Sequence, residues 1–380
     1  MLLVVSVASE AATSIRVIEP TGVHRDRAPV HTLLQLAEPV AVGTPFRLTV
    51  GGIVMPAQFR PANGSSESAS WWLDFFTSCG PRERREFLIE YGPEIKPSPE
   101  QKGGHQLHRH GDRFVVSHAP HIDWTIPRDL AGFLRSVEFH PHEHLRPDSP
   151  GFFLEDRDGK RHRLGGENVK ATVLREGRTT VALRFECQER DPALRGVRWS
   201  ADLIFPGGIS WVDVQLDIAD PEDRVAAAKL DLNLVLDPPT RRERTLVEFG
   251  ADRTVYRSLG ADDRVALVSD LRKSPAWQIN RTRRGEWQPF VVAVPNASSA
   301  EGWAQIMDRK RCLAIAFDGF GHGGEHRIEL VGDGKFKASR RFAKAGPKQW
   351  RTWLHFVQFP PRQSANSDPH MMQNPLRVTH

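Results

Sequence analysis

The sequence has few cysteines and no long apolar run. Its 380 residues include only three cysteines, Cys79, Cys187 and Cys312, which lie far apart and form no CxxC pair. This small, odd number excludes a complete disulfide framework and a structural zinc knuckle, so we expect buried thiols that pack as small hydrophobes. No apolar run approaches the roughly 20 residues of a transmembrane helix, so we expect no membrane span.

A strong excess of one charge is also absent. Lys and Arg number 52 against 47 Asp and Glu, and this net charge of +5 is scattered rather than gathered in a basic arm. The pattern argues against nucleic acid as a partner and suits an acidic small molecule or polymer as ligand. With 39% hydrophobic and 26% charged residues, the composition is that of a globular protein and excludes wholesale disorder.

The first residues are similar to part of a targeting signal. An apolar run over residues 2–7 is followed by the small residues Ala8, Ala11 and Ala12, as at the end of a secretory signal peptide, but no basic residue precedes the run. We therefore expect residues 1–14 to be a signal-peptide remnant and the protein to be secreted or periplasmic.

Most of the chain alternates apolar and polar residues over short stretches. The stretches are separated by turns rich in the 30 glycines and 28 prolines, which predicts an all-β fold with helical turns only over 221–228 and 300–309. The polar, proline-containing residues 96–104 predict a linker between a small β-barrel over 15–95 and a large antiparallel β-sandwich over 105–360. Residues 361–380 carry no strand signal and are expected to be a tail or a linker to a further domain.

Several stretches resemble a known family. Residues 39–92 are similar to the N-terminal RIFT barrel of the exo-acting rhamnogalacturonan lyase-like (YetA-like) family, a likeness carried by Gln58, Trp71, Trp72, Asp74, Phe75, Tyr91 and Gly92. Residues 151–177, 301–321 and 346–359 resemble that family's central sandwich, a galactose-mutarotase-like supersandwich. The resemblance implies a protein that binds acidic polysaccharide and cleaves it by β-elimination. In that family a helical toroid follows the sandwich, whereas this chain ends near the point where a toroid would begin.

The densest group of ionisable residues lies at 139–144, with the sequence FHPHEH. In an extended strand, alternation would place His140, His142 and His144 on one face, where three imidazoles bind a divalent metal or supply a base. The alternative is an exposed polar loop, because Pro141 disfavours a central strand. No other cofactor is indicated.

Aromatic and polar residues suggest sugar contacts elsewhere. His121, Asp123 and Trp124 form one candidate sugar pocket, and the alternative is a solvated strand start. Trp277 and Trp287 lie near basic, turn-rich segments and are candidate exposed platforms. Basic and aromatic residues together are also typical of proteins that bind single-stranded nucleic acid, but the interleaved acidic residues favour an anionic carbohydrate.

Lyase chemistry on a uronic acid needs a base, a cation that neutralises the carboxylate and a proton donor. Our candidates for the base are His142 and Tyr256, with Arg146, His140 or His144 as neutraliser. Tyr256 also fits a strand tyrosine between surface arginines. Three functions stay open: a polysaccharide-lyase-like enzyme, a non-catalytic carbohydrate-binding or scaffold module, and a mutarotase-like epimerase. The sequence does not predict the sugar or the oligomeric state.

Overall fold

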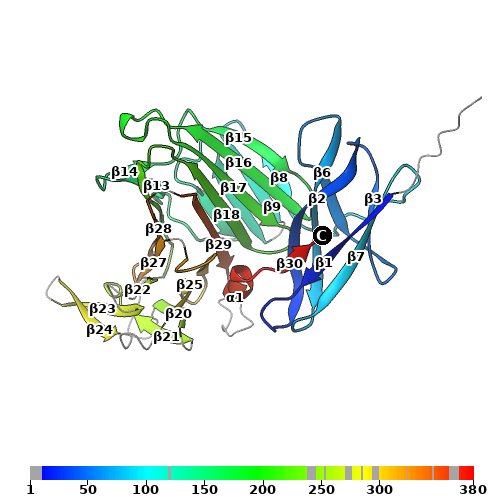
Figure 1. The fold of residues 1–380 in the computed structure, drawn as a ribbon. Coiled ribbons are helices and arrows are strands. Elements are labelled where there is room, and N and C mark those ends of the chain that lie inside the picture. The colour runs from blue at the N-terminus through cyan, green and yellow to red at the C-terminus, as the bar shows by residue number, and fades with distance from the viewer. Residues whose placement is uncertain are drawn as a thin grey trace, which may run out of the picture.

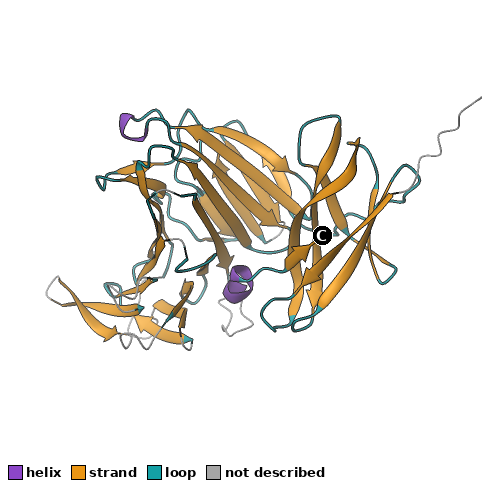
Figure 2. Ribbon diagram, in the orientation of Figure 1, coloured by secondary structure: helices purple, strands orange, loops and turns teal. Residues whose placement is uncertain are grey.

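A computed structural model describes residues 11–118, 121–237, 245–251, 254–269, 276–283, 286–292, 299–322, 324–344, 346–358 and 368–380, without the side chains of residues 282, 283, 287, 290, 292 and 368. Almost every described element is a β-strand (Figure 2), and all paired strands of the sheets are antiparallel. The all-β, antiparallel prediction is confirmed. In the described part of the chain, no helix has the length and apolar character of a membrane span.

The N-terminal domain is built from two sheets that enclose their own apolar core. One sheet has the strand order β30 (Arg377–Thr379), β1 (Ala11–Ile18), β7 (Arg84–Tyr91), β3 (Phe46–Val50), β4 (Ile53–Met55). The other has the order β2 (Arg25–Ala41), β6 (Glu67–Cys79), β5 (Ala57–Pro61).

Alternation along β6 decides which side chains enter this core. Trp71, Leu73 and Phe75 point inward and are at most 2% exposed, whereas Trp72 and Asp74 lie on the opposite face of the strand. That opposite face meets the second part of the molecule, so an acidic side chain is buried at the contact between the two parts.

The second part is a β-sandwich of three sheets (Figure 1). A five-stranded sheet has the order β12 (His142–Glu143), β11 (Ser136–Phe139), β10 (Ile122–Pro127), β9 (Arg113–His118), β8 (Gln106–Arg109). An eight-stranded sheet has the order β14 (Arg161–Arg163), β13 (Gly151–Asp156), β19 (Val225–Asn233), β28 (Lys335–Phe342), β27 (Gly324–Val331), β22 (Arg264–Val268), β23 (Trp277–Arg283), β24 (Glu286–Val292).

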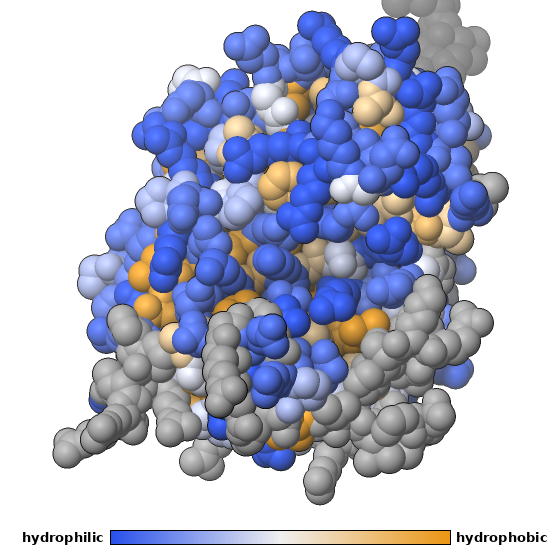
Figure 3. Space-filling model, turned by 90° about the vertical axis from the view of Figure 1, so that its left-hand side faces the viewer, coloured by the Kyte–Doolittle hydropathy of each residue, from blue (hydrophilic) through white to orange (hydrophobic). Residues whose placement is uncertain are grey.

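The third sheet has nine strands in the order β15 (Lys170–Arg175), β16 (Thr180–Gln188), β17 (Arg198–Pro206), β18 (Trp211–Ala219), β29 (Lys348–Val357), β26 (Cys312–Phe317), β25 (Ala300–Met307), β20 (Thr245–Ala251), β21 (Val255–Leu259). Among the described residues the helical elements are a 3-10 turn, η1 (Pro192–Leu194), and α1 (Asp368–Gln373). One continuous apolar core joins the three sheets. The side of the molecule that carries the eight-stranded sheet shows mostly hydrophilic residues with scattered apolar ones (Figure 3).

The nine-stranded sheet has a face that does not point into this core. Along β18, Val212, Val214 and Leu216 enter the core, whereas Trp211 and Asp213 point to the other face. This outer face of the nine-stranded sheet lies next to the N-terminal domain and α1 (Figure 1).

Both ends of the described chain differ from what the sequence indicates. Residues 11–14 belong to β1, and residues 1–10 of the expected signal remnant lie outside the described residues. Near the C-terminus, where no strand signal exists, β30 pairs with β1 through the register Val17↔Val378. The sequence does not predict β30 because three residues are too few to show an alternation of apolar and polar side chains. The strand forms through its pairing with β1, which is far away in the sequence. Residues 300–307, expected to be helical, form β25 because they pair with strands on both sides.

The buried residue Glu19, which is 1% exposed, holds Arg25, and Arg25 contacts the C-terminal segment. The Glu19 carboxylate accepts hydrogen bonds from the backbone N–H groups of Thr21 (3.1 Å) and Arg82 (3.1 Å) and from the guanidinium of Arg25 (3.0 Å). Arg25 in turn donates to the carbonyl oxygen of Asn374 at 2.9 Å. Burial alone would raise the pKa of Glu19, but the hydrogen bonds outweigh it and lower the pKa to about 2.

We predict that Glu19→Gln lowers the free energy of unfolding by about 3 kcal/mol at neutral pH. The neutral amide cannot replace the hydrogen bonds to a charged carboxylate that lower the pKa of Glu19 in the folded state. A depressed folded-state pKa stabilises the fold above the ordinary value of 4.5, and this contribution disappears as the pH falls toward 2. The free energies of unfolding of wild type and Glu19→Gln, measured with urea, should therefore converge as the pH falls from 4.5 toward 2.

The matched control is Glu86→Gln, which breaks an exposed pair with Arg16 and should cost less than about 1 kcal/mol. A stability difference between wild type and Glu19→Gln that does not change with pH would contradict this assignment.

Candidate functional site

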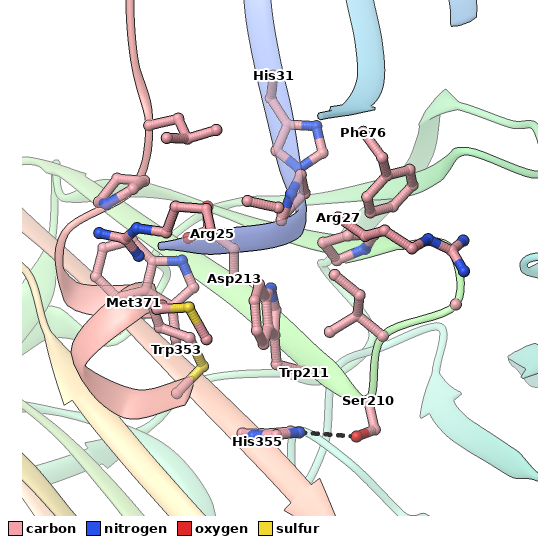
Figure 4. A pocket seen from close by; sticks show the side chains of 18 of the residues that line it. Arg25, Arg27, His31, Phe76, Ser210, Trp211, Asp213, Trp353, His355 and Met371 are labelled. Carbon is pink, nitrogen blue, oxygen red and sulfur yellow. Dashed lines mark hydrogen bonds between the residues drawn. The ribbon is translucent and has the colours of Figure 1, made fainter. Parts of the chain in front are cut away.

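A cavity of about 340 Å³ lies where the N-terminal domain, the nine-stranded sheet and α1 meet. Figure 4 shows His31 reaching in from β2 of the N-terminal domain, with Trp211, Trp353 and His355 on the sandwich below it and Met371 of α1 at one side. Three segments that are far apart in the sequence thus form its walls.

Strand pairing on the outer face of the nine-stranded sheet places the sandwich side chains. β18 and β29 are antiparallel neighbours whose register sets Trp211 opposite His355 and Asp213 opposite Trp353. Such directly opposed side chains on one face are in contact range. The rings of Trp211 and His355 meet edge to face with centroids 5.7 Å apart, and His355 Nε2 lies 2.8 Å from the hydroxyl of Ser210.

A paired arginine forms part of the cavity wall. Asp213 accepts two hydrogen bonds from Arg351, Nε to Oδ1 at 3.1 Å and Nη2 to Oδ2 at 2.7 Å. The guanidinium also lies over the ring of Trp353, 4.7 Å from its centroid. Burial alone would lower the pKa of Arg351, but the charge and hydrogen bonds of Asp213 raise it above its usual value. The guanidinium of Arg351 is therefore charged, and two hydrogen bonds to Asp213 hold it in place.

On the N-terminal side, the register of β2 and β6 sets His31 opposite Asp74. His31 Nδ1 lies 2.6 Å from Asp74 Oδ1, and Arg175 Nη1 donates to the same oxygen at 2.5 Å. Arg175 also stacks over Trp72 at 4.6 Å. Because Arg175 belongs to β15 of the sandwich, this buried cluster joins the two parts of the molecule.

The C-terminal segment forms the third wall. Met372 of α1 packs with Trp211, Trp303 and Trp353 in a small apolar cluster on the outer face of the nine-stranded sheet. Gln373 Nε2 donates to the backbone carbonyl of Phe317 at 3.0 Å. These contacts fix α1 against the sheet beside the cavity.

This set of side chains suits a polyhydroxylated ligand. Indole faces bury the C–H surface of a ligand, while a carboxylate, a guanidinium and imidazoles bond to hydroxyl groups. We describe the group as the interdomain cavity and define it by His31, Trp211, Asp213, Arg351, Trp353 and His355.

The predicted histidine cluster does not converge. A turn at residues 140–141 interrupts the expected alternation. His140 is an exposed group whose Nε2 lies 3.1 Å from Asp123, whereas His144 is 2% exposed with Nε2 3.1 Å from the carbonyl of Val357. Burial lowers the pKa of His144. Within the described ranges, no group of three His, Cys, Asp or Glu side chains has the arrangement of a metal site.

The residues chosen for lyase chemistry also lie apart. His142 is in β12 of the five-stranded sheet, and Tyr256 is half-exposed on β21, the edge strand of the nine-stranded sheet. Arg146 donates from Nε to the backbone carbonyl of Leu234 at 3.1 Å, which is a loop contact. None of the three lines the interdomain cavity.

The predicted sugar pocket on β10 is divided between two faces of one strand. Asp123 and His121 are on the solvent side, whereas Trp124 is fully buried in the sandwich core, 5.3 Å from the ring of Phe205. Neighbouring residues of a strand point in opposite directions, so Asp123 and Trp124 do not line one pocket. Trp277 is half-buried against Phe249, and the side chain of Trp287 lies outside the described residues.

The comparisons with known proteins concern the fold. No protein-family model and no curated protein matches the sequence. A glycosyl hydrolase family 38 protein from Enterococcus faecalis superposes on 97% of this chain with a TM-score of 0.56 and 10% identity. An α-mannosidase from Enterococcus faecalis V583 superposes on 97% with a TM-score of 0.54 and 10% identity.

This chain spans 47% and 46% of those two chains, about half of their length. At this identity the likeness shows a shared fold alone. A galactose mutarotase related enzyme from Lactobacillus acidophilus has 9% identity and a TM-score of 0.36 over 67% of this chain and 98% of its own. Membership in the lyase family stays a prediction.

We predict that His144 is a structural residue. His144→Ala should lower the free energy of unfolding by about 2 kcal/mol, since it removes a buried ring and its backbone contacts. His140→Ala should change it by less than about 0.5 kcal/mol, because the ring is exposed. Both effects should be the same with EDTA and with added Zn²⁺ in thermal unfolding; a zinc-dependent stabilisation that either variant abolishes would restore the metal hypothesis.

Proposed function

We propose that this chain is a carbohydrate-binding β protein that holds a sugar in the interdomain cavity. The observation that carries the proposal is the gathering of Trp211 and Trp353 beside the Asp213–Arg351 pair in one cavity. Its volume of about 340 Å³ lies at the lower end of the range for small-ligand sites, which suits one or two sugar units better than a wide groove.

The fold likeness supports a sugar as the ligand class. One of the solved proteins that share the fold over 97% of this chain is named an α-mannosidase. Taken together with the cavity, this favours a hexose-type ligand. The proposal corresponds to the binding-module hypothesis of the sequence analysis, and β-elimination is not part of it because His142, Tyr256 and Arg146 lie outside the cavity.

The charges of the cavity bear on whether the sugar is acidic. Arg351 is paired with Asp213, and Arg25 is paired with Glu19, so neither offers a free positive charge. Arg27 is exposed at the rim beside Gly208, and no carboxylate pairs with it among the described residues. An acidic sugar would therefore be recognised mainly by Arg27, and the rest of the site suits a neutral one.

The test is calorimetric titration of the full chain with methyl glycosides and short oligosaccharides of mannose, galactose, glucose and galacturonic acid. Trp353→Ala should weaken binding of the preferred sugar at least about tenfold, because a stacking face is lost. Tyr256→Ala, a matched removal of an exposed aromatic outside the cavity, should leave the affinity unchanged. Trp353→Phe should recover part of the affinity, which separates stacking from misfolding. Binding that is insensitive to Trp353→Ala, or that is lost in Tyr256→Ala, would contradict the proposed site.

A second variant separates acidic from neutral ligands. Arg27→Gln should weaken galacturonide binding severalfold, more at low ionic strength than at high, because an exposed guanidinium acts through a screened charge. It should leave binding of neutral sugars unchanged. An equal loss of affinity for neutral and acidic sugars in Arg27→Gln would show that Arg27 does not bind the carboxylate of the sugar.

A further inference from the structure

One asparagine of the chain precedes a glycine. Of the seven asparagines in the sequence, only Asn63 is followed by a glycine, Gly64. The two residues lie in the connection that joins β5 to β6, and all residues of this connection, 62–66, are exposed. None of them lines the interdomain cavity. The Asn63–Gly64 bond is therefore open to solvent and separate from the candidate site.

An asparagine in this position can react with the chain itself. The backbone nitrogen of the following residue attacks the amide carbon of the side chain and closes a five-membered succinimide ring. The side-chain nitrogen leaves as ammonia, together with the hydrogen of the attacking nitrogen. Water then opens the ring at one of its two carbonyl groups. The product is aspartate, or isoaspartate in which the backbone runs through the side chain, and water is the only co-reactant.

The backbone nitrogen of Gly64 meets the requirements of this reaction. Among the described residues, no group accepts a hydrogen bond from the Gly64 N–H, and the side-chain amide of Asn63 makes none. A Cβ placed on Gly64 would meet no atom within 4 Å, so no neighbouring group crowds the attack. Glycine also has the widest choice of backbone conformations, which lets its nitrogen approach the side chain before it.

The fold holds both ends of the connection and leaves its middle unrestrained. Ala62 N–H donates to the carbonyl of Ser70 at 2.8 Å, and Val42 N–H donates to that of Ser66 at 3.0 Å. These two hydrogen bonds lie on either side of the Asn63–Gly64 bond in the sequence. A segment without hydrogen bonds or buried contacts opens at little cost in free energy. Ring closure therefore does not require β5 or β6 to unfold.

Three other bonds of the chain could form the same ring, because an aspartate precedes a glycine: Asp158–Gly159, Asp318–Gly319 and Asp333–Gly334. In two of them the fold holds the glycine nitrogen. Gly159 N–H donates to the carbonyl of Asp156 at 3.1 Å, and Gly334 N–H donates to that of Val331 at 2.9 Å. An aspartate at neutral pH is also ionised, and a carboxylate is a poorer target for a nucleophile than an amide. Structure and chemistry together single out Asn63.

We propose that Asn63 is a site of spontaneous deamidation through a succinimide formed with Gly64. The modified chain carries aspartate or isoaspartate at position 63 and one more negative charge, so its formal net charge falls from +5 by one unit. Because the connection is exposed and held at both ends, the modified chain keeps its fold. The inference does not depend on the proposed sugar binding.

The first experiment follows the native full chain in water enriched in heavy oxygen. The protein comes from a host that does not glycosylate asparagine, because Asn63, Gly64 and Ser65 also fit the N-x-S acceptor pattern. Peptide mass spectrometry should find labelled aspartate and isoaspartate at position 63. Conversion should be faster at mildly alkaline than at neutral pH, because the attacking nitrogen must lose its hydrogen. Asn168 and Asn233, which precede valine and leucine, should stay amides. Aspartate without isoaspartate would show direct hydrolysis and contradict the succinimide route.

A pair of variants tests the role of the glycine. Gly64→Val should slow the conversion at least about tenfold, because a β-branched side chain crowds the attacking nitrogen. The open space around Gly64 accommodates the new side chain without a change in fold. Gly111→Val is the matched control, since Gly111 also lies in open space without a left-handed φ, and it should leave the rate at Asn63 unchanged. Equal rates in wild type and Gly64→Val would refute the role of Gly64.

The second experiment compares the native chain with the chain unfolded in guanidinium chloride at the same pH. The two rates at Asn63 should agree within about threefold, because neither hydrogen bonds nor packing restrain this residue in the fold. Isomerisation at Asp158 and Asp333 should be at least about tenfold faster in the unfolded chain, because the turn hydrogen bonds of the following glycines are lost. If Asn63 also converts about tenfold more slowly in the native chain, the fold protects the site and the inference is overturned.

A third measurement isolates the modified chain. Ion-exchange chromatography should resolve the modified and unmodified forms by the added charge, and both should unfold at the same urea concentration. A modified form that unfolds at a clearly lower concentration would show that the connection supports the fold, contrary to the inference. A synthetic peptide of residues 59–68 sets the time scale. A native chain without isoaspartate when half of this peptide has converted would refute the proposal.

Discussion

The carboxylate of Asp74 is buried where two domains meet, and a charge in that position is tolerated only when it is paired and hydrogen-bonded. Arg175 supplies the pairing from the sandwich and His31 supplies a second hydrogen bond from the N-terminal domain. Satisfying this one group therefore requires both domains in a fixed relative position. That position also places β2 over the outer face of the nine-stranded sheet, which creates the interdomain cavity.

The C-terminal segment completes the arrangement by a second set of contacts. β30 adds to the sheet that contains β1, and α1 packs through Met372 on the indoles of the sandwich. Arg25, held by the buried Glu19, bonds to the carbonyl of Asn374 between these two elements. The cavity is thus enclosed by one segment from each end of the chain and by the sandwich between them, so its shape depends on long-range contacts throughout.

Sequence patterns predicted the class of fold because strand alternation is local. In the structure, alternation along β6 places Trp71, Leu73 and Phe75 in the core, and β13 and β14 form a hairpin whose turn contains Gly159 at a φ of 85°. The candidate site was not predicted, because its residues meet through pairings that alternation does not encode. His31 lies 43 residues from Asp74, which lies 101 residues from Arg175. One local signal was present, an aspartate inside the apolar stretch SWWLDFF, which marks a polar side chain on a strand that is covered on both faces. The grouping of histidines at 140–144 predicted a common face, but a turn at residues 140–141 separates the side chains. Residues that are close in the sequence are therefore apart in the structure.

A crystal structure of the full chain with its preferred glycoside tests the central claim most directly. The account predicts that sugar density lies between His31 of the N-terminal domain and Trp211 and Trp353 of the sandwich. Density on the five-stranded sheet near His140, or on the edge strand near Tyr256, with the interdomain cavity free of sugar, would contradict it.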